Sequence, residues 1–350
     1  MTHRRILALL TSLVLLLTAC GGDGVDDNAD AVGGEDCEQV DQMEVGFPGL
    51  PADFIQMVFP VSIELGYMED NCLNVEVVAV ESGIAAFRAM AAGEFDLAYG
   101  GSIGPILAYG EGAPAAAIAS PGALTDFQVV ATDDIDSCEE VEGTTVATDG
   151  PGGLFHAITE QYLAGCGIDI DQDVELIVGD SETYGVRIAQ GEIEATALHI
   201  DQRIAIEDEF DVEMNVLGNS WEDLPLFHYA TWSTARSLLD DPSKRDQFVR
   251  FIAAQLMAGE WLDDEANLEE AIELMAEQSE QPEAVIEESY STFGPQFPTT
   301  CDEMMPPESY DFVIQLQVEL GNLSEAYPAT DLIDASLCEE AEEMLAEEGS

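Results

Sequence analysis

The sequence predicts an α/β protein built from two similar lobes. From residue 43 onward, short apolar runs alternate with amphipathic helical stretches, which is the order of elements in α/β folds. This series occurs over residues 43–119 and again over residues 144–198. Residues 87–96 also resemble residues 186–194. In both stretches a helix ends at a glycine, which adopts the left-handed conformation at no steric cost, and a buried strand follows. The repetition indicates two lobes built alike.

The pattern predicts the elements of each lobe in order. In the first lobe they are a strand over 43–47, a helix over 52–65, a strand over 75–80, a helix over 84–92, a strand over 95–99, a helix opened by residues 100–102 and ending near 109, and a strand over 115–119. In the second lobe they are strands over 144–148, 174–178 and 195–198, with helices over 154–164 and 182–190 between them. Apolar segments 127–131 and 226–231 are predicted to carry the chain to lobe two and back. From about residue 234 onward, apolar residues at three- and four-residue spacing predict helices.

The N-terminus has the features of an export signal. Basic residues at positions 3–5 precede an apolar run over residues 6–17, which is shorter than the roughly 20 residues that span a bilayer. The run ends in Leu-Thr-Ala-Cys, which resembles a lipobox, so we predict a signal peptide over residues 1–19 and a lipid on Cys20. An ordinary secretory signal remains the alternative, and the pair of arginines leaves twin-arginine export open.

Residues 20–36 are predicted to form a flexible tether. The stretch is rich in Gly, Asp and Ala, and it contains too little apolar surface to offset the entropy lost on folding. Such a segment would hold a folded body away from the membrane surface.

The charge balance is strongly acidic. The chain has 72 Asp and Glu residues against 9 Lys and Arg, for a formal net charge of −63. A chain of this charge has no basic face for phosphate contacts, which excludes nucleic-acid binding. Self-repulsion of this size strains a compact fold at low salt and is screened at high salt. We therefore expect a salt-rich setting, in which most acidic residues form a solvated surface.

The cysteine count favours disulfides. The chain contains seven cysteines, and six remain if Cys20 carries the lipid. Six cysteines allow 15 connectivities, and an exported protein favours pairing. Pairing between sequence neighbours, each within one lobe, gives Cys37–Cys72, Cys138–Cys166 and Cys301–Cys338. A zinc site is the alternative, but no Cys-x-x-Cys occurs and the four histidines are dispersed, so we expect neither metal nor cofactor.

Four short motifs occur in the order found in a known family. They are residues 63–77 (IELGYMEDNCLNVEV), 91–98 (AAGEFDLA), 141–147 (VEGTTVA) and 189–195 (AQGEIEA). Together they resemble the nitrate/sulfonate/taurine-type substrate-binding proteins of ABC transporters, which include binders of thiamine-pyrimidine precursors. The resemblance runs from about residue 43 to residue 261. Two positions depart from the family pattern: Cys72 stands where a glycine is usual, and Glu-Gly-Thr at 142–144 replaces Lys-Gly-Lys.

The resemblance implies a two-lobed periplasmic-binding-protein fold (type II), which closes on its ligand by hinge motion. Each lobe would be a βαβ-built sheet flanked by helices, with extra C-terminal helices on lobe one. The expected division assigns residues 37–133 and 225–350 to lobe one and residues 134–224 to lobe two.

The predicted ligand site lies beyond the carboxyl ends of the strands, where helix N-termini offer free N–H groups. Its candidates are Phe47, Gly49, Leu50, Gly101, Ser102 and Ser120 in lobe one, and Thr148, Gly150, Gly152, Asp180, Tyr184, His199 and Asp201 in lobe two. Each has a structural alternative: turn glycine, core phenylalanine, structural histidine, or helix N-cap for the aspartates. Ser102 is the preferred candidate because a hydroxyl at a helix start can donate to a ligand.

The ligand is expected to be a small nitrogen-containing organic molecule. Asp149, Asp180 and Asp201 at the mouth of lobe two suit a positive or hydrogen-donating edge, such as that of an aminopyrimidine-like heterocycle, and the candidate loops contain no basic side chain. A sulfonate-like anion, held by helix N-termini alone, is the alternative.

The expected function is that of a monomeric solute-binding protein, lipid-anchored on the extracytoplasmic face of the cell membrane, that delivers its ligand to an ABC permease. A ligand-sensing subunit with the same fold is the first alternative. An enzyme of pyrimidine-precursor synthesis is the second, but the cysteine-rich segment of such enzymes is missing. A serine hydrolase with a Gly-x-Ser-x-Gly nucleophile elbow is not expected.

Overall fold

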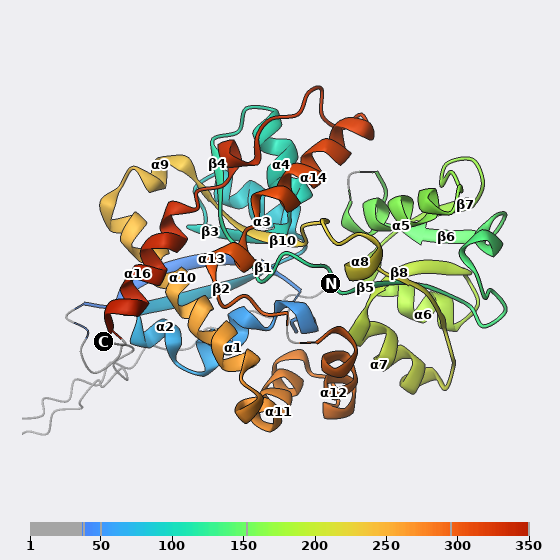
Figure 1. The fold of residues 1–350 in the computed structure, drawn as a ribbon, viewed down its shortest axis with the longest axis horizontal. Coiled ribbons are helices and arrows are strands. Elements are labelled where there is room, and N and C mark those ends of the chain that lie inside the picture. Colours follow the sequence, from blue (N-terminus) through green and yellow to red (C-terminus); the bar gives the residue numbers. More distant parts are fainter. Residues whose placement is uncertain (1–36, 38, 50, 152, 295, 349–350) are drawn as a thin grey trace, which may run out of the picture. The chain divides into compact units, whose positions relative to one another are not determined.

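The computed structural model describes residues 37–348 apart from residues 38, 50, 152 and 295. The predicted signal peptide and the predicted tether with Cys20 lie outside the described residues. The described residues belong to one compact unit. It is an α/β protein with two separate five-stranded sheets, one for each lobe (Figure 1). The two-lobed α/β fold predicted from the sequence is therefore confirmed.

The sheet of lobe one combines parallel and antiparallel strands. Its strands are β1 (Asp41–Pro48), β2 (Leu73–Val80), β3 (Leu97–Gly101), β4 (Ala115–Ala119) and β10 (Ala230–Ala235). Their order is β2-β1-β3-β10-β4. β1 pairs in parallel with β2 and β3, whereas β10 runs antiparallel between β3 and β4.

The sheet of lobe two repeats this arrangement. Its strands are β5 (Phe127–Ala131), β6 (Thr145–Thr148), β7 (Glu175–Val178), β8 (Ala195–His199) and β9 (Asn215–Asn219). Their order is β7-β6-β8-β5-β9, with β6 parallel to β7 and β8 and with β5 antiparallel to β8 and β9. In each lobe, the antiparallel strand is the one that the chain forms after it crosses from the other lobe. The two lobes therefore share one topology.

The internal echo in the sequence marks the same structural step in each lobe. Helices α3 (Gly83–Ala91) and α6 (Tyr184–Ala189) are followed by Gly93 and Gly191, whose φ angles are 79° and 69°. Glycine adopts this left-handed conformation without the cost of a Cβ atom. The chain then turns into β3 or β8, as the sequence predicted.

Helices flank both sheets. Lobe one has α1 (Val58–Glu64), α2 (Tyr67–Asp70), α3 and α4 (Ile103–Gly110), and lobe two has α5 (Leu154–Gly165), α6, α7 (Ile200–Phe210) and α8 (Ser220–Asp223). The C-terminal helices are α9 (Arg236–Leu239), α10 (Pro242–Asp263), α11 (Leu268–Ser279), α12 (Glu283–Phe293), α13 (Cys301–Met304), α14 (Pro307–Glu319), α15 (Ala329–Leu332) and α16 (Ser336–Glu348). None of the helices within the described residues is both long and apolar enough to cross a bilayer.

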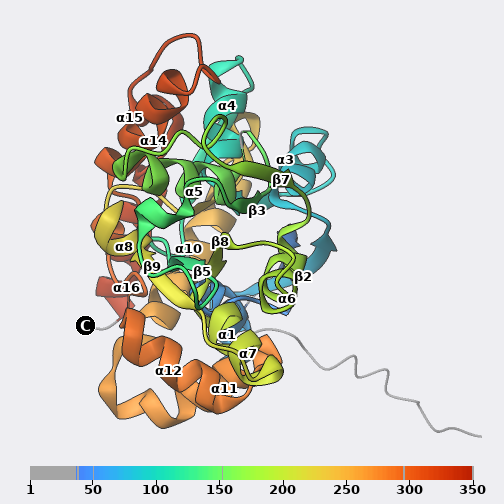
Figure 2. The ribbon, with the colours of Figure 1, turned by 90° about the vertical axis from the view of Figure 1, so that its right-hand side faces the viewer.

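The C-terminal helices pack mainly on lobe one, as expected. α10 contacts α1, α2 and α16, and α14 contacts α4. In addition, α12 contacts α7, so the C-terminal segment also reaches lobe two (Figure 2).

Aromatic side chains fill the core of lobe one. Phe47, Phe59, Tyr99 and Trp232 are all at most 3% exposed. The rings of Phe47 and Tyr99 stack with centroids 4.8 Å apart, and those of Phe59 and Trp232 meet edge to face at 4.7 Å. Each such phenylalanine stabilises the fold by about 1.5–3 kcal/mol relative to an exposed one.

Three disulfides connect the predicted cysteine pairs. Cys37–Cys72 and Cys301–Cys338 lie in lobe one and its C-terminal helices, and Cys138–Cys166 lies in lobe two. The paired cysteines are 35, 37 and 28 residues apart in sequence. Closing loops of this length in the unfolded chain stabilises a protein by about 2–4 kcal/mol per bridge.

Some predicted boundaries are wrong. The strand expected over residues 226–231 is instead β10 (Ala230–Ala235), because these are the residues whose backbone pairs with β3 and β4. Helix α4 also begins later than expected, because β3 continues through the two glycines at its end.

The sheet of lobe two also differs from the expectation. The strand β9 was not predicted, since its sequence NVLGN has little β-propensity. β5 lies in this sheet although it precedes residue 134, where lobe two was expected to begin.

Candidate functional site

A cleft of about 260 Å³ lies between the lobes at the carboxyl ends of their parallel strands, where ligands bind in open α/β sheets. Loops after β1, β2 and β3 form one wall, and loops after β6, β7 and β8 form the other. The lining residues are Pro48, Gly49, Asp53, Gln56, Glu81, Ser82, Gly83, Ile84, Gly101, Ile103, Gly104 and Tyr229 from lobe one, and Asp149, Gly153, Leu154, Phe155, Ser181, His199 and Gln202 from lobe two.

The turn after β1 brings two polar side chains to the cleft. Gly49 has a φ angle of 70°, and a short 3₁₀ helix, η1 (Phe54–Gln56), begins directly after Asp53. Nε2 of Gln56 donates to Oδ2 of Asp53 at 3.2 Å and to the hydroxyl of Tyr229 at 3.1 Å. Oε1 of Gln56 is buried and has no hydrogen-bond partner among the described residues.

A close backbone approach forms another part of the wall. A Cβ atom at Gly100 would lie 2.6 Å from Cα of Gly83. Only glycine at both positions lets the start of α3 lie against the end of β3. This contact places Gly83 and Gly101 on the cleft surface.

A buried histidine lies at the floor of the cleft. Nδ1 of His199 donates to Oδ1 of Asp126 at 2.6 Å, and Nε2 lies 3.7 Å from Oδ2 of Asp53. The imidazole also packs on Phe127, with ring centroids 4.0 Å apart. His199 ends β8 and Asp126 precedes β5, so the two antiparallel strands of lobe two hold this pair together.

Hydrogen bonds join the two lobes beside His199. The backbone N–H of Phe54 donates to Oδ2 of Asp201 at 3.0 Å, and Nε2 of Gln202 donates to Oδ1 of Asp53 at 3.1 Å. Asp201 and Gln202 lie in the first turn of α7, so lobe two contacts the turn after β1 of lobe one through this helix start.

The buried charges shift one another's proton affinities. Burial disfavours the charged imidazole, but the carboxylates of Asp126 and Asp53 outweigh this effect and raise the pKa of His199 to about 10. Burial, with the neighbouring charges of Asp53 and Asp126, raises the pKa of Asp201 to about 7. Burial also raises the pKa of Asp53 and that of Asp149. At neutral pH the floor of the cleft therefore contains one imidazolium among several carboxyl groups.

Few of the predicted ligand residues line the cleft. Gly49, Gly101 and His199 do so. Asp201 instead lines an adjoining hollow of about 280 Å³ that shares Asp53, Ser181 and Gln202 with the cleft.

Other predicted candidates bind groups within the protein. The hydroxyl of Ser102 donates to the carbonyl of His228 at 2.7 Å, and that of Ser120 donates to the carbonyl of Gly122 at 2.8 Å. The hydroxyl of Thr148 lies 3.0 Å from Nδ1 of His156, and that of Tyr184 donates to the carbonyl of Gly179 at 2.9 Å. These side chains are not lining residues of the cleft because backbone or histidine partners hold them inside the lobes.

The remaining candidates also lie away from the cleft surface or outside the described residues. Phe47 belongs to the aromatic core, Gly150 is a turn glycine with a φ angle of 87°, and Asp180 does not line the cleft. Leu50 and Gly152 lie outside the described residues.

Several lining residues were not predicted from the sequence, notably Asp53, Gln56, Phe155, Gln202 and Tyr229. Asp53 and Gln56 follow the turn of the first predicted strand by a few residues, and Gln202 follows the third strand of lobe two in the same way. Ligand residues were expected directly at the carboxyl ends of the strands. Asp53, Gln56 and Gln202 would have been included if the first helical turn after each strand had been counted as well.

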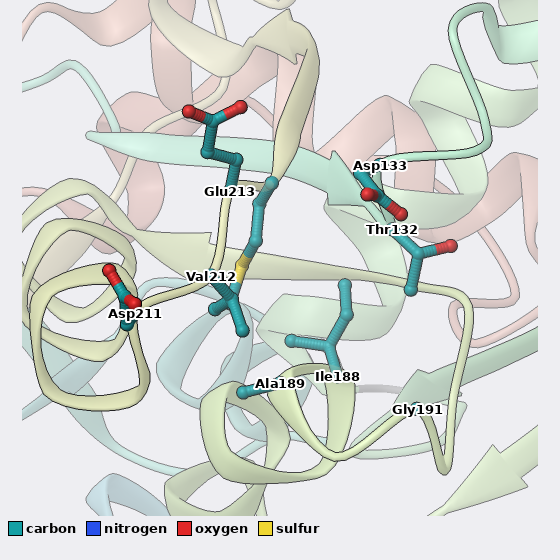
Figure 3. Close-up of a pocket in the computed structure, with 9 residues that line it drawn as sticks. Thr132, Asp133, Ile188, Ala189, Gly191, Asp211, Val212 and Glu213 are labelled. Atoms are coloured by element: carbon teal, nitrogen blue, oxygen red, sulfur yellow. The ribbon is translucent and has the colours of Figure 1, made fainter.

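A second hollow, of about 530 Å³, lies in lobe two away from the cleft. It is lined by Thr132, Asp133, Ile188, Ala189, Gly191, Asp211, Val212, Glu213 and Met214. Figure 3 shows the apolar side chains of Ile188 and Val212 between the acidic side chains of Asp133 and Asp211. These residues come from the ends of β5, α6 and α7, at the edge opposite to the carboxyl ends of the parallel strands. Throughout the described residues, no group of His, Cys, Asp and Glu is arranged to hold a metal ion.

The fold and the cleft define a two-lobed protein of the periplasmic-binding-protein class. The alkanesulfonate-binding protein SsuA from Xanthomonas axonopodis pv. citri, bound to MOPS, superimposes with a TM-score of 0.68 at 16% identity, over 85% of this chain and 99% of that one. The aliphatic sulphonate-binding protein SsuA from Escherichia coli gives 0.64 at 20% identity, over 84% and 92%. The nitrate-binding protein NrtA from Synechocystis PCC 6803 gives 0.70 at 15% identity, over 87% and 89%. At these identities the likeness shows the fold.

A family model described as NMT1/THI5 like matches residues 56–261, more than half of the chain. The chain therefore belongs to the NMT1/THI5-like family, which confirms the resemblance seen in the sequence. A search of curated proteins found no significant match.

Proposed function

We propose that this chain is an extracytoplasmic, lipid-anchored solute-binding protein that captures a small organic molecule between its lobes and delivers it to an ABC importer. In this proposal the protein binds its ligand without chemical change. The expected division sets residues 37–133 and 225–350, with the C-terminal helices, against residues 134–224. We change it at one place: β5 (Phe127–Ala131) would move with the second lobe, because it pairs with β8 and β9.

The observation that carries the proposal is the cleft itself. It lies at the carboxyl ends of six parallel strands, three from each lobe, and its volume of about 260 Å³ suits a small molecule. Its walls combine apolar side chains with a few buried polar groups, which is the composition of small-molecule sites. The hydrogen bonds of Asp201 and Gln202 across the lobes are the contacts that opening would break.

The comparisons support a transport role. The structural neighbours are alkanesulfonate-, sulphonate- and nitrate-binding proteins, and two of them are described as periplasmic. Periplasmic binding proteins close on their solute by a hinge motion between two lobes.

Thermal unfolding of the purified full-length chain in detergent, with a panel of solutes at high salt, tests the binding function. The panel contains nitrate, taurine, alkanesulfonates, aminopyrimidines, amines and amino acids. A ligand that binds the native state at a hundredfold excess over Kd adds about 2.7 kcal/mol of stability. We expect one chemical class to raise Tm. A Tm that no solute changes would contradict the proposal.

The membrane anchor is proposed from the lipobox at Cys20. The acidic tether that follows would keep the lobes free of the membrane surface. Replacement of Cys20 by serine should prevent lipidation and release the protein from the membrane fraction. Retention of Cys20→Ser in that fraction would contradict the lipid anchor.

We further propose that the protein is a monomer adapted to high salt. The cleft edges must stay free to close and to contact a permease, and 72 acidic residues are best screened by salt. Sedimentation should give a monomer, and dilution to low salt should lower Tm. A stable dimer or a salt-independent Tm would contradict these two points.

A further inference from the structure

The floor of the cleft has more negative than positive charge. The carboxyl groups of Asp53, Asp126 and Asp201 all act on His199, which supplies a single positive charge. Asp126 is fully buried and Asp201 is 1% exposed, so water does not solvate them. Unbalanced buried carboxylates are costly. Asp201 reduces the imbalance by retaining a proton up to about pH 7. A second cation in the cleft would stabilise the remaining carboxylates.

Of the three floor carboxylates Asp53, Asp126 and Asp201, Asp53 is the one that lines the cleft. Its side chain is 23% exposed, whereas that of His199 beside it is 5% exposed. A carboxylate has about four acceptor positions. Gln202 and Gln56 each occupy one of them. Nε2 of His199 also lies 3.7 Å from Oδ2 of Asp53. The positions that remain can accept N–H groups from a ligand.

Gln56 supplies a second acceptor that lacks a donor. It is 7% exposed and lines the cleft. Its Nε2 is held by Asp53 and Tyr229, which fixes the amide orientation and leaves Oε1 without a hydrogen-bond partner among the described residues. A buried carbonyl oxygen left unpaired costs about 1–3 kcal/mol. A ligand with N–H donors would satisfy it.

Building on the proposed function, we propose that the cleft binds a small organic cation, whose N–H groups bind the carboxylate of Asp53 and the amide oxygen of Gln56. Amines, guanidines and amidines have this chemistry. The apolar part of such a ligand would lie against Ile103, Leu154 and Phe155, which line the same cavity.

The rest of the lining disfavours an anion. The described lining residues include Glu81 and Asp149 besides Asp53, and none of them is lysine or arginine. The imidazolium of His199 is already hydrogen-bonded to Asp126. A sulfonate in this cleft would meet several carboxylates and only one cation that is already paired. The ligand class therefore differs from the sulfonates and nitrate named for the structural neighbours.

Calorimetric titration with three ligands of matched shape tests this inference. Benzamidine is a cation with N–H donors, benzamide is its neutral counterpart, and benzenesulfonate is an anion of similar size. Methylguanidine and benzylamine widen the cation set. The purified full-length chain in detergent should bind at least one of the three cations, and it should bind neither benzamide nor benzenesulfonate measurably.

Two variants locate the binding. Asp53→Asn keeps the shape of the side chain and removes its charge, so it should weaken binding of the cation about tenfold or more, because hydrogen bonds to charged groups are the stronger ones. Asp133→Asn removes an exposed carboxylate from the second hollow in lobe two and should leave cation binding unchanged. Equal effects of the two variants would show that Asp53 makes no specific contact, and would overturn the proposal.

The ligand titrations distinguish failure of the cation inference from failure of the proposed solute-binding function. Binding of benzenesulfonate, or of any other anion or neutral solute, without binding of a cation would overturn the cation inference and leave the solute-binding function standing. Failure of all three cations overturns the inference as well. If the whole solute panel also failed to raise Tm, the solute-binding function itself would be contradicted.

Discussion

The interlobe cleft and the second hollow in lobe two are both rimmed by acidic residues, but their walls differ. The hollow is about twice as large, 530 Å³ against 260 Å³. Its carboxylates, Asp133, Asp211 and Glu213, are exposed to solvent. At the cleft, Asp126, Asp201 and His199 are at most 4% exposed and are bound to one another or to the facing lobe.

The volume of a cavity is therefore a weaker guide to a binding site than the burial and pairing of its polar groups. Exposed carboxylates are solvated and gain little from a ligand. Buried and unevenly charged groups gain a great deal from a partner of the right charge.

The largest effect is expected from loss of the cation at the floor of the cleft. His199→Gln leaves Asp126 buried without its partner, and breaking a buried ion pair destabilises a protein by about 3–5 kcal/mol. The control is Arg187→Gln on α6, which removes an ion pair with Glu192, a residue that follows the helix and whose side chain is 55% exposed. This loss should cost about 0.2–1 kcal/mol. Urea unfolding measures both. Similar losses in the two variants would contradict the distinction between the buried pair at the floor of the cleft and an ion pair at the surface.

The same histidine gives stability a pH dependence. A histidine whose pKa rises on folding stabilises the fold fully below its unfolded pKa of about 6.5, and this contribution is lost as pH rises toward the folded pKa of about 10. Calorimetry should show Tm of the native chain falling between pH 7 and pH 10, by an amount comparable to the loss in His199→Gln. The variant should show a much flatter profile, and parallel profiles would contradict the assignment.

A smaller effect is expected from the backbone approach at the cleft wall. Gly100→Ala would place a Cβ atom 2.6 Å from Cα of Gly83, and such overpacking costs about 1–3 kcal/mol. Gly104→Ala lies in α4 on the same wall with nothing within 4 Å of the added atom, so it should raise stability by about 0.5–1 kcal/mol. Unfolding free energies measure the pair, and a loss at both positions would show that the wall is tight throughout.

The smallest effects are expected at the second hollow in lobe two. Glu213→Gln and Asp133→Asn change exposed side chains, so each should alter the unfolding free energy by less than about 0.5 kcal/mol. Neither should change the Tm shift produced by a bound ligand. A lost ligand shift in either variant would move the binding site to this hollow.

The sequence predicted much of the fold because local patterns decide it. The echo around Gly93 and Gly191 marked two like lobes, and the helix and strand periods placed β4 and β5 at their observed bounds. The disulfide pairs followed from keeping each bridge within one lobe.

The site was predicted only in part because its side chains are positioned by tertiary contacts. Ser102 lies at a strand end, as expected, but the loop before β10 accepts its hydroxyl hydrogen and holds it inside the lobe. Asp126 lies in a segment between strands, and only the antiparallel pairing of β5 with β8 brings it to His199. No local sequence pattern records that pairing.

The most direct test of the account is a crystal structure of the protein grown with benzamidine. We expect electron density for the ligand in the interlobe cleft, with its amidinium nitrogens within hydrogen-bonding distance of the Asp53 carboxylate and of Oε1 of Gln56. Density in the second hollow of lobe two, or a cleft that stays empty at saturating benzamidine while benzenesulfonate fills it, would contradict the account.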